Sequence, residues 1–353
     1  MNSVLSERTA PAGVSTILAP FRSDLGASAE LGRAAIFVRA GPGDEANRWV
    51  ERFVASLRTG GPPGRLVVVD GAPAGVVVWE EPCSLGATVE LIHLAPNAVS
   101  RERYHRLLLS VEQVVGPIAF VGGPLGGLEH GDESELMAGL GYVPFGRSEM
   151  RLGSGVALPE PRLDPPTILR HVEPTDEPAL ARLHARAYHG TLDRYLFWAD
   201  ADEEVDARDH FSDVFRGRWG ALVASGSWVA EESGRPVGAV LSVRTDVGIL
   251  IVDVMVDPER RGAGIGRACL LASVRSVRSA GEEPIYLNVT EGNESALRLY
   301  DRTGFVRSLG PTRDWYNSAR IPVPPPGVVR SVPAGRLGLA RFVREPSQGG
   351  ERR

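Results

Sequence analysis

Residues 256–266 of this chain, VDPERRGAGIG, combine arginine and glycine in an order that can bind an anion. The mostly apolar run before them, residues 249–255, predicts a buried strand, and the apolar spacing of residues 267–274 predicts a helix. Glycines in such a turn let backbone N–H groups approach phosphate oxygens closely, and the helix dipole adds partial positive charge. Arginine side chains can bind the same oxygens. The segment therefore predicts a phosphate-binding turn between a strand and a helix.

Two common phosphate-binding loops do not fit this segment. A dinucleotide-binding fingerprint that begins at Gly262 needs a glycine where Arg267 stands. A Walker A loop needs lysine, and all 39 basic residues of the chain are arginine. The remaining pattern, R-x-x-G-x-G from Arg261 to Gly266, resembles the pyrophosphate loop of the GNAT (Gcn5-related) acyl-CoA N-acyltransferases. A glycine turn that serves only as a tight connection is the alternative interpretation.

Residues 293–305, NESALRLYDRTGF, resemble a second GNAT signature, N-x-x-A-x-x-x-Y-x-x-x-G-F, at every fixed position. Asn293 and Tyr300 are two helical turns apart, so they share one face of the predicted helix. Ala296 keeps that face shallow enough for a ligand. An ordinary amphipathic helix would not need the asparagine, the alanine and the Gly-Phe exit together. Because both segments occur in the family's order, the chain is identified as a member of the GNAT superfamily.

The resemblance implies an α/β fold in which a mixed, mostly antiparallel twisted sheet is flanked by helices. It also implies that acetyl-CoA is the acyl donor and that no metal is needed; His184 and His189, five residues apart, lack the spacing of a helical zinc pair. The residues expected to contact acetyl-CoA are Val254, Met255, Val256, Arg261, Gly262, Ala263, Gly264, Ile265, Gly266, Arg267, Asn293 and Tyr300.

Landmarks of the first half of the chain recur in the second half at nearly constant spacing. Gly75, Pro96 and Gly141 correspond in this way to Gly238, Pro258 and Gly304. The equal spacing predicts a tandem duplication of one fold. The glycine loop is not duplicated, because residues 97–102, NAVSRE, contain no glycine. The pattern resembles the tandem GNAT arrangement of mycothiol synthase-like actinobacterial acyltransferases, in which one half is active and the other is a scaffold.

Four segments follow from this duplication. We expect a degenerate GNAT-like domain at residues 1–152, a proline-rich linker at 153–167, a catalytic GNAT domain at 168–321 and a Pro/Gly-rich, partly disordered tail at 322–353.

An aromatic and acidic segment in the second half is the expected acceptor site. Matching Arg39 with Arg170 near the openings of the two halves places an insertion within residues 187–220. In GNAT folds the corresponding region closes over the acceptor, and aromatic faces and carboxylates can bind an amine. We therefore expect the acceptor to contact Tyr188, Asp193 and Tyr195. Packing of an added helix onto the core is the alternative.

Acyl transfer from a thioester to an amine also needs a proton donor and a base. By resemblance, Tyr300 protonates the departing thiolate, since a phenol of pKa ~10 can protonate a thiolate of pKa ~8.5. The position at which many GNAT enzymes carry a catalytic glutamate is Leu250 here. Asp253 is the only carboxylate inside the strand and is the expected base, unless it holds a bulge or a substrate ammonium. The competing carboxylates are Asp193, Asp246 and Glu291.

Composition narrows the class of protein further. A length of 353 residues suits two domains, and a net charge of −5 argues against nonspecific binding to nucleic acid. We find neither an apolar run of the ~18 residues that cross a bilayer nor a secretory signal, so we expect a cytoplasmic protein without membrane partners. The oligomeric state is not predicted.

The sequence as a whole predicts an acetyl-CoA-dependent N-acetyltransferase that acts by direct transfer on a primary amine of a small molecule. A mycothiol synthase-like acetyltransferase is one alternative. A non-catalytic module that senses acyl-CoA is the other.

Overall fold

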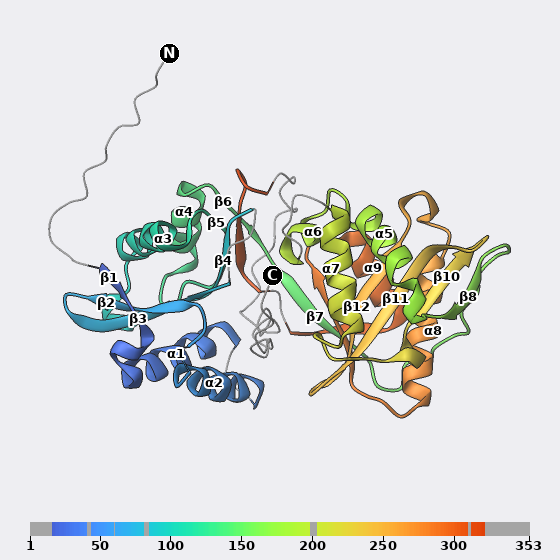
Figure 1. The fold of residues 1–353 in the computed structure, drawn as a ribbon, viewed down its shortest axis with the longest axis horizontal. Helices are drawn as coiled ribbons and strands as arrows, with labels where there is room; N and C mark the ends of the chain where they lie inside the picture. Colours follow the sequence, from blue (N-terminus) through green and yellow to red (C-terminus); the bar gives the residue numbers. More distant parts are fainter. Residues whose placement is uncertain are drawn as a thin grey trace, which may run out of the picture.

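The computed structural model describes residues 16–40, 44–59, 61–80, 85–197, 203–309 and 312–321. The chain forms two lobes that lie side by side, each built on one sheet (Figure 1). The predicted tail, residues 322–353, lies outside the described residues. Among the helices of the described ranges, none has the length and apolarity that crossing a bilayer requires.

The first lobe contains a seven-stranded sheet in the order β1-β2-β3-β4-β5-β15-β6. Its strands are β1 (Thr16–Ala19), β2 (Gly64–Val69), β3 (Ala72–Trp79), β4 (Ala87–Leu94), β5 (Ile118–Gly122), β6 (Tyr142–Phe145) and β15 (Asp314–Asn317). Strands β4 and β5 pair in parallel, and the other described pairs are antiparallel. Two short turns accompany them, η1 (Phe21–Ser23) and η2 (Pro96–Ala98).

Helices cover both faces of the first sheet (Figure 1). Helices α1 (Leu25–Ala40) and α2 (Asp44–Leu57) form one apolar core with it, and helices α3 (Arg101–Val115) and α4 (His130–Gly139) form another. Both sheet faces are therefore buried, and most positions of β3 and β4 are buried.

The second lobe contains an eight-stranded sheet in the order β14-β7-β13-β12-β11-β10-β8, with β9 paired to β11. Its strands are β7 (Arg147–Leu152), β8 (Ile168–His171), β9 (Ala221–Leu222), β10 (Trp228–Glu232), β11 (Arg235–Thr245), β12 (Gly248–Val256), β13 (Ile285–Thr290) and β14 (Phe305–Leu309). Strands β12 and β13 pair in parallel, and the other described pairs are antiparallel.

The second sheet is covered in the same way as the first. Helices α5 (Glu177–Tyr188) and α7 (Glu203–Phe215) pack on one face, with α6 (Leu192–Phe197) between them in the chain. Helices α8 (Ile265–Ser279) and α9 (Glu294–Thr303) pack on the other face. The short turns are η3 (Pro174–Asp176), η4 (Ala224–Gly226) and η5 (Pro258–Arg260).

The two lobes repeat one order of elements, from β2 to β6 and again from β10 to β14. The predicted fold class, two α/β halves with mostly antiparallel sheets flanked by helices, is confirmed. The matching of Arg39 with Arg170 is wrong, because Arg39 lies in α1 whereas Arg170 lies in β8, whose counterpart is β1. Since α5 and α7 correspond to α1 and α2, the helix added to the second lobe within the described ranges is α6.

Each sheet contains one strand from the other half of the chain. Strand β7 follows β6 in the chain but lies between β13 and β14, and β15 follows β14 but lies between β5 and β6. Figure 1 shows β7 running from the first lobe into the second. Chain order and sheet membership therefore differ at these two strands, and the domain boundaries drawn from the sequence stay a prediction.

The exchanged strand β15 is anchored in the first lobe by a buried tryptophan. Trp315 is 1% exposed, and its indole N–H donates a hydrogen bond to Glu133 Oε1 at 3.0 Å. The neighbouring Arg313 forms an ion pair with Glu133 Oε2 at 3.0 Å. Glu133 itself is fully buried on α4, so it depends on these donors.

Replacing this tryptophan tests the exchange. We expect Trp315→Ala to lower the free energy of unfolding by about 3–5 kcal/mol, because it removes a large core side chain. The exchange also predicts that both lobes unfold in one transition, which urea unfolding followed by circular dichroism measures. Trp228→Ala, at a half-buried tryptophan of β10, is the control with a smaller loss. Two separate transitions in the wild-type protein would contradict the coupling of the lobes.

Candidate active site

A cavity of about 810 Å³ lies in the second lobe, where β12 and β13 meet the N-terminal ends of α8 and α9. Residues of α5, α6 and α7 line its other side. The strand exchange brings two further charged residues to its wall, Arg147 from β7 and Asp314 from β15. The cavity is therefore built from both faces of the second sheet and from both exchanged strands.

Strands β12 and β13 diverge as they approach this cavity. Their parallel pairing covers residues 249–251 of β12 and 285–287 of β13, although the strands continue to Val256 and Thr290. Beyond the paired part, the backbone edge of β12 is open to the cavity, and Val254 and Val256 line it. The side chain of Met255 points into the core instead. An extended ligand can form hydrogen bonds with such an open strand edge.

One additional residue in β12 determines where Asp253 points. Opposite β11, Leu241 pairs with Asp253 and Ser242 pairs with Ile251, so Val252 is the extra residue of a β-bulge. In a regular strand Ile251 and Asp253 would face the same side. Here Ile251 packs in the core beside α8, whereas the carboxylate of Asp253 meets side chains of α5 and α7. The bulge therefore turns Asp253 away from the core and toward these helices.

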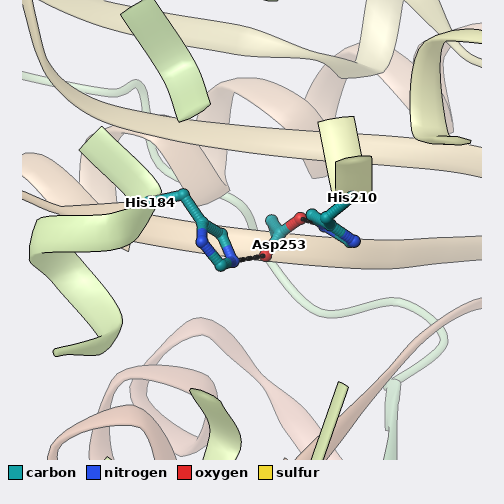
Figure 2. Close-up of side chains that lie close together, drawn as sticks. All are labelled: His184, His210 and Asp253. Carbon is teal, nitrogen blue, oxygen red and sulfur yellow. Dashed lines mark hydrogen bonds and ion pairs between the residues drawn. The ribbon is translucent and has the colours of Figure 1, made fainter. Parts of the chain in front are cut away.

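Asp253 lies at the centre of a buried polar cluster (Figure 2). Its side chain approaches His210 of α7, whose Nε2 is 2.7 Å from Oδ2. The hydroxyl of Tyr188 on α5 donates a hydrogen bond to Oδ1 at 3.2 Å. His184, one turn earlier on α5, has its Nε2 3.9 Å from the same oxygen. Figure 2 shows the two imidazoles approaching the carboxylate from opposite sides.

The protonation states in this cluster follow from burial and charge. Burial disfavours the charged carboxylate, but the attraction of His210 and its hydrogen bond outweigh this, so the pKa of Asp253 lies below its ordinary value. Burial lowers the pKa of His184 to about 3, so this imidazole is neutral at neutral pH. Burial also raises the pKa of Tyr188 well above its ordinary value, which keeps its hydroxyl protonated. His210 and Tyr188 therefore stabilise an ionised carboxylate.

His184, His210 and Asp253 offer ligand atoms that lie within 4.8 Å of one another, so their geometry can be compared with that of a metal site. In a tetrahedral zinc site with zinc–nitrogen distances near 2 Å, ligand atoms lie about 3.3 Å apart. The carboxylate of Asp253 is 2.7 Å from one imidazole and 3.9 Å from the other. The shorter distance is that of a direct hydrogen bond, so the geometry fits a carboxylate–imidazole pair better than a set of metal ligands.

The loop before α8 leaves space for an anion. Gly262 and Gly264 have φ values of +84° and +79°, a left-handed conformation that favours glycine. A Cβ atom added to either would meet no atom within 4 Å. Gly264 is the N-cap of α8 and has no side chain to accept the first N–H groups of the helix. These N–H groups are therefore available to a phosphate.

Arginines at this loop fasten α5 to it. The guanidinium of Arg261 donates a hydrogen bond to the carbonyl oxygen of Ala187 at 2.7 Å. Arg186 forms an ion pair with the buried Asp257, just after β12, at 2.9 Å. Both contacts hold the end of α5 that carries Tyr188. Direct contact of Arg261 with phosphate stays a prediction, because the structure shows this side chain bound to α5.

In the first lobe, side chains fill the corresponding place. The hydroxyl of Ser100, the N-cap of α3, accepts a helix N–H at 3.2 Å. Tyr104 is fully buried, and its hydroxyl accepts a hydrogen bond from the N–H of Leu94 and donates one to the carbonyl of Gly126. At the same position after the N-cap of α8 stands the small Ala268. The first lobe therefore lacks the space that the second lobe has within the described ranges.

The first lobe nevertheless has the same bulge. Opposite β3, Glu90 is the extra residue of β4, and Leu91 follows it where Asp253 stands in the second lobe. Leu91 is buried among apolar side chains of α1 and α2. The duplicated backbone thus carries a carboxylate at this position in the second lobe and an apolar side chain in the first.

Helix α9 brings the two predicted residues of the second signature to the cavity. Asn293 is the N-cap of α9, and its Oδ1 accepts a hydrogen bond from the N–H of Ala296 at 3.2 Å. Tyr300 is buried on the cavity side, and burial raises its pKa above the ordinary value. Its hydroxyl is therefore protonated at neutral pH, as a proton donor must be.

The residues predicted for the acceptor separate into two groups. Tyr188 and Asp193 line the cavity, and Asp193 accepts a hydrogen bond from the hydroxyl of Thr290. Tyr195 packs against apolar side chains of the first lobe, with the guanidinium of Arg194 4.8 Å from its ring centre. The structure therefore does not bring Tyr195 together with the other two, and Tyr195 holds α6 in place.

The competing carboxylates have other partners. Glu291 accepts a hydrogen bond from Ser148 and forms an ion pair with Arg307 at 3.1 Å. The side chain of Asp246 is 59% exposed and lies 3.8 Å from Arg48. Of the candidates for a base, Asp253 is the one that the structure places in a buried polar cluster at the cavity.

Comparison with known proteins identifies the family of the chain. Residues 185–305 match the model of the acetyltransferase (GNAT) family. A mycothiol acetyltransferase from Thermobispora bispora is 31% identical over 273 residues, which cover 73% of this chain and 85% of that protein. A mycothiol acetyltransferase from Geodermatophilus obscurus is 28% identical over 320 residues, or 85% of this chain and 93% of that protein.

The fold comparison extends over both lobes. The crystal structure of a GCN5-related N-acetyltransferase from Sphaerobacter thermophilus superposes with a TM-score of 0.57. The identity is 20%, and the match covers 87% of this chain and 95% of that one. The arrangement of two lobes is therefore shared with a solved protein.

The open loop in one lobe predicts a single binding site for acetyl-CoA. We expect Gly264→Glu to abolish binding, because it places a bulky negative side chain at the N-terminal end of α8. Gly264→Ala introduces the same backbone strain without the charge and is the matched control, with a smaller loss. Isothermal calorimetry measures both affinity and stoichiometry. Two bound molecules per chain, or normal binding by Gly264→Glu, would refute this assignment.

Proposed function

The chain belongs to the acetyltransferase (GNAT) family, and on that premise we propose how it transfers an acetyl group from acetyl-CoA to the primary amine of a small molecule. The observation that carries the proposal is the cavity, which joins an open helix N-terminus, an open strand edge and Tyr300. The use of acetyl-CoA as donor supports a cytoplasmic location.

Acetyl-CoA extends along the cavity from α8 to α9 in this proposal. Its pyrophosphate lies at the loop from Arg261 to Arg267, where the N–H groups at the start of α8 are not capped by a side chain. Its pantetheine arm lies between the diverging strands and pairs with the backbone at residues 254–256. Asn293 closes the far side from the start of α9. The thioester then lies near Tyr300.

Tyr300 protonates the thiolate of CoA as the carbon–sulfur bond breaks. Burial raises the pKa of its phenol, which by itself makes the phenol a weaker acid. The same dry surroundings disfavour a charged thiolate and so make the thiolate a stronger base. The stronger basicity of the thiolate therefore offsets the weaker acidity of the phenol.

The acceptor amine enters from the side of α5, α6 and α7. The buried negative charge of Asp253 stabilises the positive charge that forms when a proton leaves the amine. Tyr188 and Asp193 line the cavity beside it. The relatives named mycothiol acetyltransferases make mycothiol-related amines the first acceptors to test. Leu250, at the position of the usual glutamate, requires that the base has moved to another residue.

A protein that only senses acyl-CoA is the rival reading. It would need the binding loop but neither the buried tyrosine nor the charged cluster beside it. A carboxylate and an imidazole at the wall of the cavity can move protons, which binding alone does not require, so the cluster at Asp253 favours an enzyme. Release of free thiol from acetyl-CoA in the presence of a panel of primary amines, including mycothiol-related ones, separates the two. Tight binding of acetyl-CoA without thiol release for any amine would favour the sensor.

We expect Tyr300→Phe to lower kcat by about 10²-fold or more, since the ring still packs and only the proton donor is lost. Binding of acetyl-CoA should stay within a few-fold of the wild type. Tyr142→Phe, at a buried tyrosine of the first lobe, is the matched control and should keep kcat. Stopped-flow measurement of thiol release with saturating acceptor tests the prediction. A kcat equal to that of the wild type, with chemistry rate-limiting, would show that water supplies the proton.

A further inference from the structure

We propose, on the basis of the acetyl transfer proposed above, that His210 is the general base that takes the proton of the acceptor amine. Asp253 is then a positioning residue, which holds the imidazole and stabilises its charged form. The proton acceptor is therefore an imidazole on α7 and not the carboxylate on β12.

The geometry of the pair supports this division. His210 lines the cavity, and its Nε2 is 2.7 Å from Oδ2 of Asp253. An ionised carboxylate can only accept hydrogen bonds, so Nε2 carries the proton in this pair. The lone pair of the imidazole is then on Nδ1, which points away from the carboxylate in Figure 2. A base oriented by a carboxylate in this way has its reactive nitrogen fixed in one direction.

The carboxylate itself is a poorer base. Hydrogen bonds from His210 and Tyr188 occupy both of its oxygens. These partners also hold the pKa of Asp253 below its ordinary value despite burial, so its affinity for a proton is low. Catalytic bases work best when their pKa is near the working pH. Asp253 is therefore suited to hold a positive imidazole and unsuited to accept the proton itself.

The second histidine has a different place. His184 stacks on the ring of Tyr188, with ring centres 4.4 Å apart, and its pKa is lowered to about 3 by burial. It is neutral at neutral pH and has little tendency to take a proton. The centre of its ring lies 5.2 Å from that of His210, so it packs beside the base.

Among the contacts described for His210, the one with Asp253 is a charged contact at hydrogen-bond distance, and aromatic rings pack around the imidazole. Trp219 lies 6.1 Å from its ring, and Phe211 lies 5.3 Å away. One turn earlier on α7, Asp206 lies 3.8 Å from Arg194 of α6. Besides burial, the negative charge of Asp193 across the cavity contributes to the raised pKa of Tyr188 and of Tyr300.

The reaction balances with these two groups. The nitrogen of the amine attacks the carbonyl carbon of the thioester, so that a C–N bond forms and the C–S bond breaks. His210 Nδ1 takes one proton from the nitrogen, and the CoA sulfur takes the proton of Tyr300. Exchange with water returns both residues to their starting states. The products are an amide and free CoA thiol.

His210→Gln tests the base directly, because glutamine still donates a hydrogen bond to Asp253 but cannot take a proton at neutral pH. We expect kcat/KM to fall by about 10²–10⁴-fold with acetyl-CoA affinity unchanged. The loss in kcat/KM should be smaller for acceptor amines of lower pKa, because these lose a proton more readily without a base. His93→Gln, at a buried histidine of the first lobe, is the control and should keep wild-type kcat/KM.

Asp253→Asn gives a second, distinguishable result. It removes the charge that favours the imidazolium, so we expect a lower rate with the affinity for acetyl-CoA unchanged. A structural role of His210 predicts instead that His210→Gln keeps the rate of the wild-type protein, and that result would overturn the proposal. Loss of activity on treatment with a chelator, restored by Zn²⁺ alone, would also overturn it in favour of a metal site.

A readout without turnover separates this proposal from the proposed function. Nitrogen-15 NMR of the histidine side chains should show that Nε2 of His210 carries the proton in the free protein. Asp253→Asn should change the chemical shift of this nitrogen, because the hydrogen bond to a charged carboxylate is lost. An Nδ1–H form would overturn the assignment even if the enzyme acetylates amines. Conversely, absence of thiol release with every amine would count against the acetyl transfer while the NMR result stands by itself.

Discussion

The additional residue at Val252 is the constraint on which the active site depends. A regular β12 would point Asp253 to the side of Ile251, where α8 packs and a largely apolar core lies. The bulge turns it to α5 and α7, where hydrogen bonds from His210 and Tyr188 make a charged group tolerable. The first lobe, with the same bulge and Leu91, shows that the backbone shape came with the duplicated fold and that the chemistry depends on the side chain.

One of the helices that meet this carboxylate, α5, is held in place by contacts with the binding loop and with the residue after β12. Arg261 and Arg186 bind the end of α5 to the loop and to the buried Asp257 after β12. The position of Tyr188 is therefore linked to the loop that we assign to the pyrophosphate. Two exchanged strands add Arg147 and Asp314 to the same cavity. Because each sheet contains a strand from the other half, the first lobe supports the site even though side chains such as Tyr104 fill its own binding place.

Local sequence patterns predicted the parts of this protein that depend on local geometry. The turn at Gly262 and Gly264 and the helix with Asn293 and Tyr300 are each set within a few residues, so their spacing carries the information. The repeated landmarks predicted the two similar lobes. The alignment of the beginnings of the two lobes is wrong, because it rests on one pair of arginines and not on the strand β1. The predicted insertion is therefore too long.

The remaining features depend on contacts between distant segments. His184, His210 and Asp253 come from three elements, and they meet because a bulge reverses the direction of one side chain. No periodicity in the sequence reports that reversal. The strand exchange was equally hidden, since β7 and β15 have ordinary strand sequences whose place in a sheet is set by partners far along the chain. Tyr195 is two residues from Asp193 and was predicted to contact the acceptor with it, but its side chain packs against the other lobe.

A structure of the protein bound to a bisubstrate analogue, in which CoA is joined to a primary amine, tests the central claim most directly. The account predicts one analogue per chain in the second lobe, with its pyrophosphate at the loop around Gly264. The amine nitrogen should lie within hydrogen-bond distance of His210 Nδ1, and the sulfur should lie near the hydroxyl of Tyr300. An amine nitrogen bound to an oxygen of Asp253, with His210 turned away, or an analogue bound in the first lobe, would contradict it.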